Sequence, residues 1–305
     1  MKQTDAASTK REGEILFYVN GRWVPQSQAF VSVLDEGFRY GFTIFEGIRI
    51  VDGAIFRLDD HLERLWRSAK ATRLDIPHSR DELRRICLQF VERNEILDGH
   101  MSLRVTPGLG GYGRDRVGGA TVVLFGGPRD PLYEGKEGIR LKTASVRRIP
   151  PECIDPRIKN ANYLNHVLAL QEGKVAGVDD ALLLDIRGFV SEMPWANVFI
   201  VKGRALYTPT KYYVLDGITR ATVAEIMKKE GHEVLEEDIT LYDVYTADEA
   251  FACGSYTDIV SIVEVDGRAI GSGRAGPVTT KVMELYAKAT RTDGPWVSRV
   301  LPRSA

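Results

Sequence analysis

The chain has 305 residues, of which 44% are hydrophobic and 27% charged, so it carries enough apolar material for one large domain or two ordinary ones. Lysine and arginine number 41 against 42 aspartate and glutamate, and the net charge of −1 argues against binding nucleic acid or an anionic membrane surface. Three widely spaced cysteines without a CxxC pair favour a reducing, cytoplasmic setting. The polar start of the chain and the absence of a long apolar run predict neither a signal peptide nor a membrane span.

Turn signals and apolar periodicity predict the order of elements. After a loose tail over residues 1–14, five turn dipeptides between β-rich runs predict antiparallel hairpins: Asn20-Gly21, Asp52-Gly53, Arg187-Gly188, Lys202-Gly203 and Asp266-Gly267. Helical spacing predicts helices over residues 58–72, 83–91, 163–175, 220–230 and 279–289. Ser79 and Glu82 form a capping box before the second of them. The mixture predicts an α/β (α+β) fold with much antiparallel pairing.

A stretch rich in glycine and proline near residues 126–138 is the best candidate for a linker. It divides the chain into two predicted mixed α/β domains. We assign residues 15–130 to a smaller N-terminal domain, 131–138 to the linker and 139–305 to a larger C-terminal domain.

Several common site patterns do not fit this sequence. The glycine-dense segment 108–119 is followed by a strand-like run instead of opening a helix, so a glycine loop is preferred to a dinucleotide fingerprint. The five histidines are scattered and form no HExxH pair, which leaves metal catalysis unsupported. No GxSxG elbow is present, so a serine hydrolase is unsupported as well.

Three groups of stretches carry a resemblance when they are taken together. They are YGFTIFEGIR (40–49) with RLDDHLERL (57–65); RIKNANYLNHVLA (157–169); and SEMPWANVF (191–199) with Leu206, Thr208, LDGITR (215–220) and YTADEAFACGS (245–255). Singly, each has an ordinary explanation, such as a solvated lysine or a surface carboxylate. Their order and spacing resemble the fold-type IV pyridoxal-phosphate enzymes over residues 17–290. Pro194 departs from the class, which usually has a small residue there.

The resemblance implies a cofactor, pyridoxal 5′-phosphate, and a residue for each of its parts. Lys159 matches the lysine that holds the cofactor as a Schiff base and then moves the substrate proton. Glu192 matches the anion that faces the protonated pyridine nitrogen, and Tyr163 the phenol that binds the cofactor's phenolic oxygen. The residues implied to hold the phosphate or to brace the site are Arg64, Asn197, Ile218, Thr219 and Ser255.

Within the class, YGFTIFEGIR, NYLNHVLA and LYDVYTADEAF look most like the branched-chain aminotransferases. That likeness implies a ping-pong transfer from hydrophobic, branched-chain-type L-amino acids to 2-oxoglutarate. It also implies a homodimer or higher homo-oligomer, because a neighbouring subunit completes the substrate pocket in this class. Tyr40, Phe45, Arg49 and Tyr256 would line the substrate side.

The substrate carboxylate is the point where this sequence departs from that family. Branched-chain enzymes carry Tyr-x-Arg where this chain has His100-Met101-Ser102, so Ser102 replaces the arginine in the implied substrate site. We expect Arg114 or Arg116 in the glycine loop to supply the charge, with Arg49 or Arg104 as the next candidates.

Other activities on the same cofactor remain open at this stage. SVRRIPPECIDPRIKN resembles the corresponding stretch of (R)-amine transaminases, so an (R)-selective amine or D-amino-acid transaminase is the main alternative. An aminodeoxychorismate lyase-like β-elimination would use the same lysine. A binding protein without catalytic activity is the most distant alternative.

Overall fold

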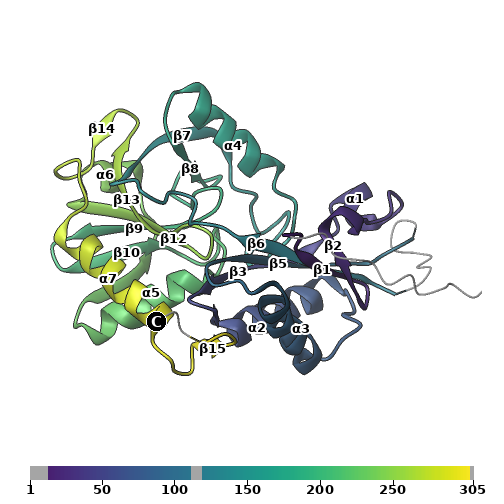
Figure 1. Cartoon of the computed structure of the whole chain (residues 1–305). Coiled ribbons are helices and arrows are strands. Elements are labelled where there is room, and N and C mark those ends of the chain that lie inside the picture. Colours follow the sequence, from purple (N-terminus) through teal and green to yellow (C-terminus); the bar gives the residue numbers. More distant parts are fainter. Residues whose placement is uncertain (1–12, 111–118, 303–305) are drawn as a thin grey trace, which may run out of the picture. The chain divides into compact units, whose positions relative to one another are not determined.

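The computed structural model describes residues 13–110 and 119–302 (Figure 1). The chain forms two compact units, one of Met1–Arg129 with Asp293–Ala305 and one of Asp130–Thr292. The sequence interpretation assigned residues 293–305 to the C-terminal domain. In the structure, β15 (Val297–Arg299) pairs with β4 (Ala54–Phe56), which joins the end of the described chain to unit 1.

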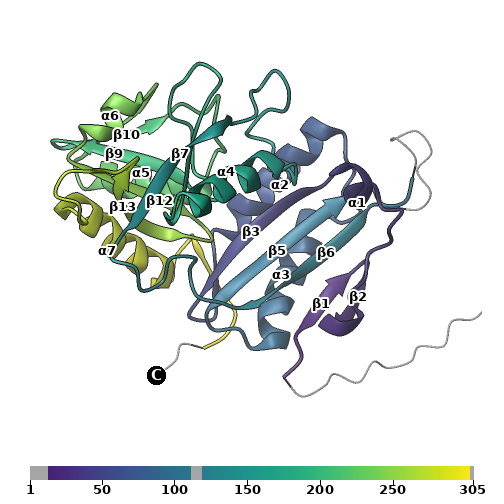
Figure 2. The ribbon, with the colours of Figure 1, turned by 90° about the horizontal axis from the view of Figure 1, so that it is seen from above.

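Unit 1 is an antiparallel sheet of seven strands in the order β15-β4-β3-β5-β6-β1-β2. The remaining strands are β1 (Leu16–Val19), β2 (Arg22–Pro25), β3 (Ile44–Val51), β5 (Gly99–Thr106) and β6 (Thr121–Pro128). Two helices, α2 (Leu58–Thr72) and α3 (Arg80–Asn94), cover one face of this sheet (Figure 2). The short elements η1 (Gln26–Gln28) and α1 (Glu36–Tyr40) lie between β2 and β3 in the chain.

Unit 2 is built on a mixed sheet of eight strands, seven of which follow the order β11-β10-β9-β12-β13-β7-β8. Its strands are β7 (Ile139–Arg147), β8 (Asp180–Leu184), β9 (Asn197–Lys202), β10 (Ala205–Pro209), β11 (Glu233–Glu237), β12 (Glu249–Gly254), β13 (Asp258–Val265) and β14 (Arg268–Ala269). Its helices are α4 (Leu164–Val175), α5 (Ile218–Lys229), α6 (Leu241–Tyr245) and α7 (Pro277–Arg291). The pairs β10–β11, β7–β8 and β13–β7 are parallel, and the others are antiparallel. The predicted mixture of helices with a largely antiparallel sheet is confirmed.

Both faces of the unit 2 sheet are buried. Successive residues of β9 alternate between two apolar clusters, with Val198 and Ile200 in one and Phe199 and Val201 in the other. Phe199 stacks on Phe251 of β12 at 5.0 Å between ring centroids, and helices α5 and α7 close that face. Because apolar side chains pack against both faces of the sheet, its strands are held firmly and so provide a rigid support for the loops that connect them.

Most of the local predictions are confirmed. Four of the five turn dipeptides lie where paired strands join. Both residues take the positive φ angles of a tight hairpin in three of them, as at Asp52 (49°) and Gly53 (67°), whereas at Lys202-Gly203 only the glycine does (61°) and Lys202 still belongs to β9. Arg187-Gly188 differs, because only the isolated bridge Leu184–Val190 closes that turn. The helix α3 begins after Ser79 with the expected capping box. Among the described residues, no helix is long and apolar enough to cross a membrane.

Candidate active site

Lys159 and Tyr163 meet where the loop after β7 enters α4. Lys159 Nζ donates to the Tyr163 hydroxyl at 3.4 Å, and Tyr163 is the N-cap residue of α4. The phenol ring stacks on Trp195 with 5.5 Å between centroids, and the ring of His166 meets it edge-on at 4.5 Å. Two aromatic neighbours therefore fix the phenol beside the amine.

Glu192 presents a buried carboxylate whose two oxygens are both occupied. Its Oε1 accepts from Arg148 Nε at 2.7 Å, and its Oε2 accepts from Asn197 Nδ2 and from the Leu215 backbone N–H, both at 3.0 Å. Charge-assisted bonds of this kind are the strong ones, and Glu192 is only 4% exposed. The carboxylate is therefore held in one orientation.

Asn197 connects this carboxylate to the start of α5. Its Nδ2 also donates to the Leu215 carbonyl at 3.1 Å, and a Cβ at Gly217, the N-cap of α5, would collide with its Oδ1. Only glycine fits at that position. The helix has no side-chain cap, so the backbone N–H groups of Ile218 and Thr219 in its first turn meet no side-chain acceptor there. Such a helix start attracts an anion.

Two further residues of the family-like pattern, Thr208 and Arg220, have structural contacts. Arg220 donates from Nε to Thr208 Oγ1 at 3.2 Å and from Nη2 to the Pro209 carbonyl at 3.0 Å. The Thr208 hydroxyl in turn donates to the Val198 carbonyl at 2.8 Å. These bonds attach the end of β10 to the first turn of α5, and so position the uncapped helix start.

Ser255 and Tyr256 occupy the turn between β12 and β13. The turn is closed by a bond from the Thr257 N–H to the Gly254 carbonyl at 3.1 Å. A Cβ at Gly254 would press against the Trp195 carbonyl, so this turn lies directly on the segment between Glu192 and Asn197. The predicted cofactor residues of unit 2 thus gather around one end of its sheet.

In unit 1, Arg64 belongs to a buried charge cluster. Its Nε and Nη2 donate to the two oxygens of Glu46 at 2.8 and 2.6 Å, and His61 Nδ1 donates to Glu46 Oε2 at 2.7 Å. Burial alone raises the pKa of the Glu46 carboxyl, but the charge and hydrogen bonds of Arg64, assisted by His61, outweigh burial and lower that pKa to about 2. The pair fixes one edge of the Arg64 guanidinium.

This cluster predicts a stability effect. Glu46→Gln leaves Arg64 without its ionic partner, and breaking a buried pair in this way costs about 3–5 kcal/mol in the free energy of unfolding. Because the folded-state pKa lies below the ordinary 4.5, the contribution of Glu46 is fully present above pH 4.5 and is lost as the pH falls towards 2. Thermal unfolding of wild type and variant between pH 3 and 8 measures both effects. The control is Glu63→Gln, which breaks an exposed ion pair between Glu63 of α2 and Arg80 and should change the free energy of unfolding by about 1 kcal/mol or less. An equal loss of stability in both variants would contradict the prediction.

The predicted substrate residues of unit 1 lie mainly on β3 and β5. Phe45 pairs with Arg104, whose guanidinium lies 5.0 Å from the Phe45 ring centroid and donates from Nε to Ser102 Oγ at 3.3 Å. Arg49 donates from Nη1 to two carbonyls of its own sheet, those of Ile50 and Gly99, at 2.9 and 3.0 Å.

The remaining predicted substrate residues lie outside that strand pair. Tyr40 lies at the end of α1, and the Arg39 guanidinium lies over the Tyr40 ring, 4.8 Å from the ring centroid. Arg114 and Arg116 lie outside the described residues.

Sequence reasoning missed the partners that hold the predicted residues in place. Arg148 lies 44 positions before Glu192 in the sequence and donates a hydrogen bond to its carboxylate. Trp195 stacks on Tyr163. His166 lies three residues after Tyr163, on the same side of the helix, and this spacing was an available signal. Glu46 lies in the quoted FEGIR run, yet no local pattern identifies Arg64 as its partner.

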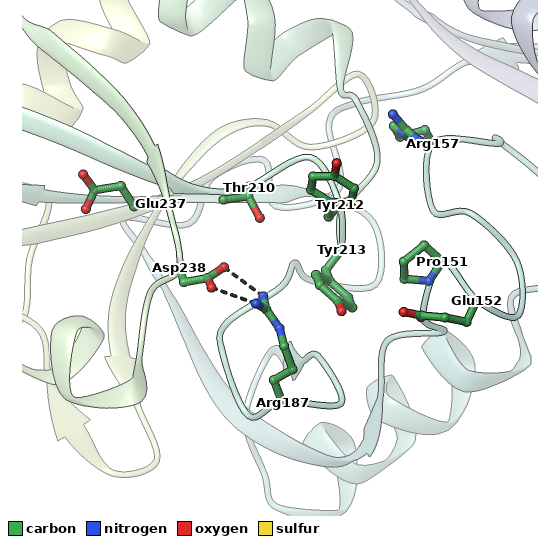
Figure 3. A pocket seen from close by; sticks show the side chains of 9 residues that line it. All are labelled: Pro151, Glu152, Arg157, Arg187, Thr210, Tyr212, Tyr213, Glu237 and Asp238. Atoms are coloured by element: carbon green, nitrogen blue, oxygen red, sulfur yellow. Dashed lines mark hydrogen bonds and ion pairs between the residues drawn. The ribbon is translucent and has the colours of Figure 1, made fainter.

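A groove of about 750 Å³ in unit 2 has a lining that does not include Lys159 or Glu192 (Figure 3). Tyr212, Tyr213 and Arg187 are among its lining residues, and Arg187 is bound to Asp238 by two hydrogen bonds of 2.8 Å. Arg187 also pairs with Asp185 at 2.8 Å, so its charge is neutralised within the protein. The groove offers neither the lysine nor the uncapped helix start that distinguishes the Lys159 site.

A fixed lysine–phenol pair, a clamped carboxylate and an uncapped helix start are the parts that a pyridoxal-phosphate enzyme requires. Residues 43–265 match the family model described as amino-transferase class IV. The chain belongs to the class IV aminotransferases, which confirms the predicted fold-type IV family and the prediction of an enzyme.

The similar proteins agree with this family. A putative branched-chain-amino-acid aminotransferase of Methanocaldococcus jannaschii is 44% identical over 88% of this chain and 94% of its own. The branched-chain-amino-acid aminotransferase of Pseudomonas aeruginosa is 37% identical over 90% of this chain and 92% of its own. The crystal structure of the T.th. branched-chain amino acid aminotransferase with pyridoxamine 5′-phosphate is 34% identical, with a TM-score of 0.89 over 94% of this chain and 99% of that one.

The described residues fit a pyridoxal phosphate. The clamped Glu192 would supply an anion for a ring N–H, and the Lys159 amine lies beside a phenol that is itself fixed. The uncapped first turn of α5 would supply donors for a phosphate, and Asn197 fixes its position relative to Glu192.

Proposed function

We propose that this chain is a cytoplasmic, pyridoxal-phosphate-dependent transaminase. It moves the amino group of hydrophobic, branched-chain-type L-amino acids to 2-oxoglutarate in two half-reactions. The observation that carries the proposal is the contact of Lys159 with Tyr163 in the same unit as the clamped Glu192. The choice of substrate rests on the similarity to branched-chain aminotransferases over nearly the whole chain.

Three residues of unit 2 have separate roles where the substrate would react: Lys159, Tyr163 and Glu192. The bound cofactor supplies the carbonyl that takes up an amino group and the ring that withdraws electrons from the substrate Cα. Lys159 Nζ is the base that takes the proton from Cα and returns it. The Tyr163 hydroxyl, 3.4 Å away, orients this amine, and Glu192 stabilises a protonated ring nitrogen.

The phosphate is bound by donors from several elements. The backbone N–H groups of Ile218 and Thr219 at the start of α5 would donate to it, and the Ser255 hydroxyl would add a further donor. Arg64, oriented by Glu46, is the proposed guanidinium ligand.

Arg114 and Arg116 remain our proposed ligands for the substrate carboxylate. Ser102 cannot supply a positive charge, and Arg49 already donates to two carbonyls of its own sheet. A bidentate arginine contact is worth more than a hydroxyl contact. The glycine loop is therefore expected to favour amino acids over amines without a carboxylate.

A half-reaction screen tests this function. We expect L-leucine and L-glutamate to discharge the cofactor's absorption band in the purified, cofactor-loaded protein, with (R)-1-phenylethylamine reacting weakly. The double variant Arg114→Ala/Arg116→Ala should raise KM for amino acids by about tenfold or more while sparing KM for the amine. Preference of the wild type for (R)-1-phenylethylamine would replace the branched-chain assignment by an amine transaminase. Pyruvate release without an acceptor would indicate a lyase.

A homodimer is the expected assembly. Unit 1 exposes four large apolar side chains within nine residues, each 59–77% exposed: Phe30, Val33, Leu34 and Phe38. Apolar groups gathered in this way mark interaction surfaces, and a second copy of the chain is the occupant that we propose. Sedimentation should give about twice the 34.0 kDa chain mass, and Leu34→Asp/Phe38→Asp should shift it towards monomer. A fully active wild-type monomer at assay concentration would contradict the dimer.

A further inference from the structure

His166 is buried in unit 2 with both ring nitrogens unsatisfied by protein groups. The residue is 2% exposed, and neither Nδ1 nor Nε2 has a hydrogen-bond partner among the described residues. Buried polar atoms of native proteins are nearly always hydrogen-bonded, because leaving one unpaired costs its full desolvation penalty. A partner for this ring is therefore expected from outside the chain.

The imidazole is uncharged. Burial lowers the pKa of His166, and the positive charges of Arg148 and Lys159 lower it further, to about 2. A neutral imidazole has one N–H donor and one nitrogen that accepts. The missing partner therefore has to donate a hydrogen bond to the ring or to accept one from it.

A small, partly enclosed cavity adjoins this ring. It has a volume of about 10 Å³, room for about one water, and its lining includes Arg148, Asn162, Tyr163 and His166. Arg148 uses Nε for Glu192, and the described residues give its two Nη groups no protein acceptor. The lining thus includes both a guanidinium and an imidazole, and a water needs two to four polar partners.

We propose that this cavity binds one internal water, which accepts from Arg148 and donates to the unprotonated nitrogen of His166. His166 is then a positioning residue. Through the water it holds the Arg148 guanidinium that clamps Glu192, and through its ring edge it supports Tyr163. This second role rests on the proposed function, whereas the water site does not.

Two variants separate the polar role of His166 from its packing role. His166→Phe keeps an aromatic edge against Tyr163 but removes the acceptor, and His166→Gln keeps polar atoms able to bind the water. In the cofactor-free protein we expect His166→Phe to melt about 2–4 °C below wild type and His166→Gln to melt close to it. A crystal structure of the wild type at high resolution should show a water within about 3.2 Å of both Arg148 and His166.

The positioning role has its own measurement. The dissociation constant for pyridoxal 5′-phosphate, obtained by absorbance titration, should rise about fivefold in His166→Phe and recover in His166→Gln. Phosphate-free pyridoxal, titrated in parallel, should show the same ratio, since the water acts at the ring end of the site.

Each contrary outcome has a definite meaning. A dry cavity in the crystal, or a His166→Phe protein that melts at or above wild type, overturns the water, because removing an unpaired imidazole should stabilise. A lower melting temperature with an unchanged cofactor dissociation constant overturns the positioning role alone. A wild type that binds no cofactor overturns the proposed function, while the crystal structure and the melting temperatures still decide the water site.

Discussion

Replacing Lys159 by alanine is expected to abolish transamination, with kcat falling by about 10⁴-fold or more. The substitution removes the amine that binds the cofactor covalently and the base that moves the Cα proton, and a positioned base alone contributes up to about 10⁴-fold. The fold should survive, because Lys159 lies in a loop before α4 and its long 3.4 Å contact with the Tyr163 hydroxyl holds no element of the sheet in place. Single-turnover absorbance measurements and thermal unfolding of the variant test both statements.

A labelling experiment identifies the lysine directly. Borohydride reduction of the cofactor-loaded wild type, followed by peptide mapping, should place the label on Lys159. Lys174→Ala is the matched control, because that lysine lies in the last turn of α4 and should leave turnover and labelling unchanged. A label on Lys174, or on Lys202, whose ammonium pairs with Asp243 at 2.6 Å, would disprove the assignment.

The local parts of this fold could be predicted from short stretches of sequence. The capping box at Ser79 and Glu82 satisfies the start of α3 with neighbours three residues apart, so its signal is contained in one turn. Asp52-Gly53 adopts positive φ angles that few other dipeptides tolerate. In both cases the energetics depend on residues adjacent in sequence.

Contacts between distant segments left no such signal. The pairing of β15 with β4 joins residues more than 200 positions apart. It is made by backbone hydrogen bonds, which do not depend on the side chains and therefore leave no pattern in the sequence. The parallel order of β7, β8 and β13 is equally non-local. A boundary drawn from composition therefore kept residues 293–305 with the C-terminal domain, whereas the pairing of β15 with β4 joins the end of the described chain to unit 1.

The candidate site shows the same division. Lys159, Tyr163 and Glu192 were predicted from their order and spacing along the chain, because the family resemblance is itself a pattern of sequence. Their partners were not, since an arginine such as Arg148 is indistinguishable in sequence from a solvated one until the fold buries it. His166 is an intermediate case, because its spacing from Tyr163 places it on the same side of α4. Its burial beside Arg148, however, depends on the path of the loop between β7 and α4.

Replacing Glu192 by glutamine is the second change expected to have a very large effect on turnover. A neutral amide cannot stabilise a protonated ring nitrogen, and loss of one preorganised electrostatic contact costs roughly 10²–10³-fold in kcat. The substitution also leaves Arg148 buried without its ionic partner, and breaking such a pair costs about 3–5 kcal/mol of stability. Lost activity and lost stability are therefore expected together, and the single variant does not separate them.

The double variant Glu192→Gln/Arg148→Met makes that separation. Methionine removes the stranded charge, and replacing both members of a buried pair by groups of similar volume is often close to neutral for stability. We expect its melting temperature to recover most of the way to wild type while kcat stays at the level of Glu192→Gln, because the ring nitrogen still lacks its anion.

Glu172→Gln, at an exposed carboxylate that accepts from Ser145, is the control and should leave kcat unchanged. If activity returns together with stability, Glu192 acts only by holding Arg148 and the loop in place. If kcat stays low in a protein as stable as wild type, the negative charge at this position serves the reaction itself.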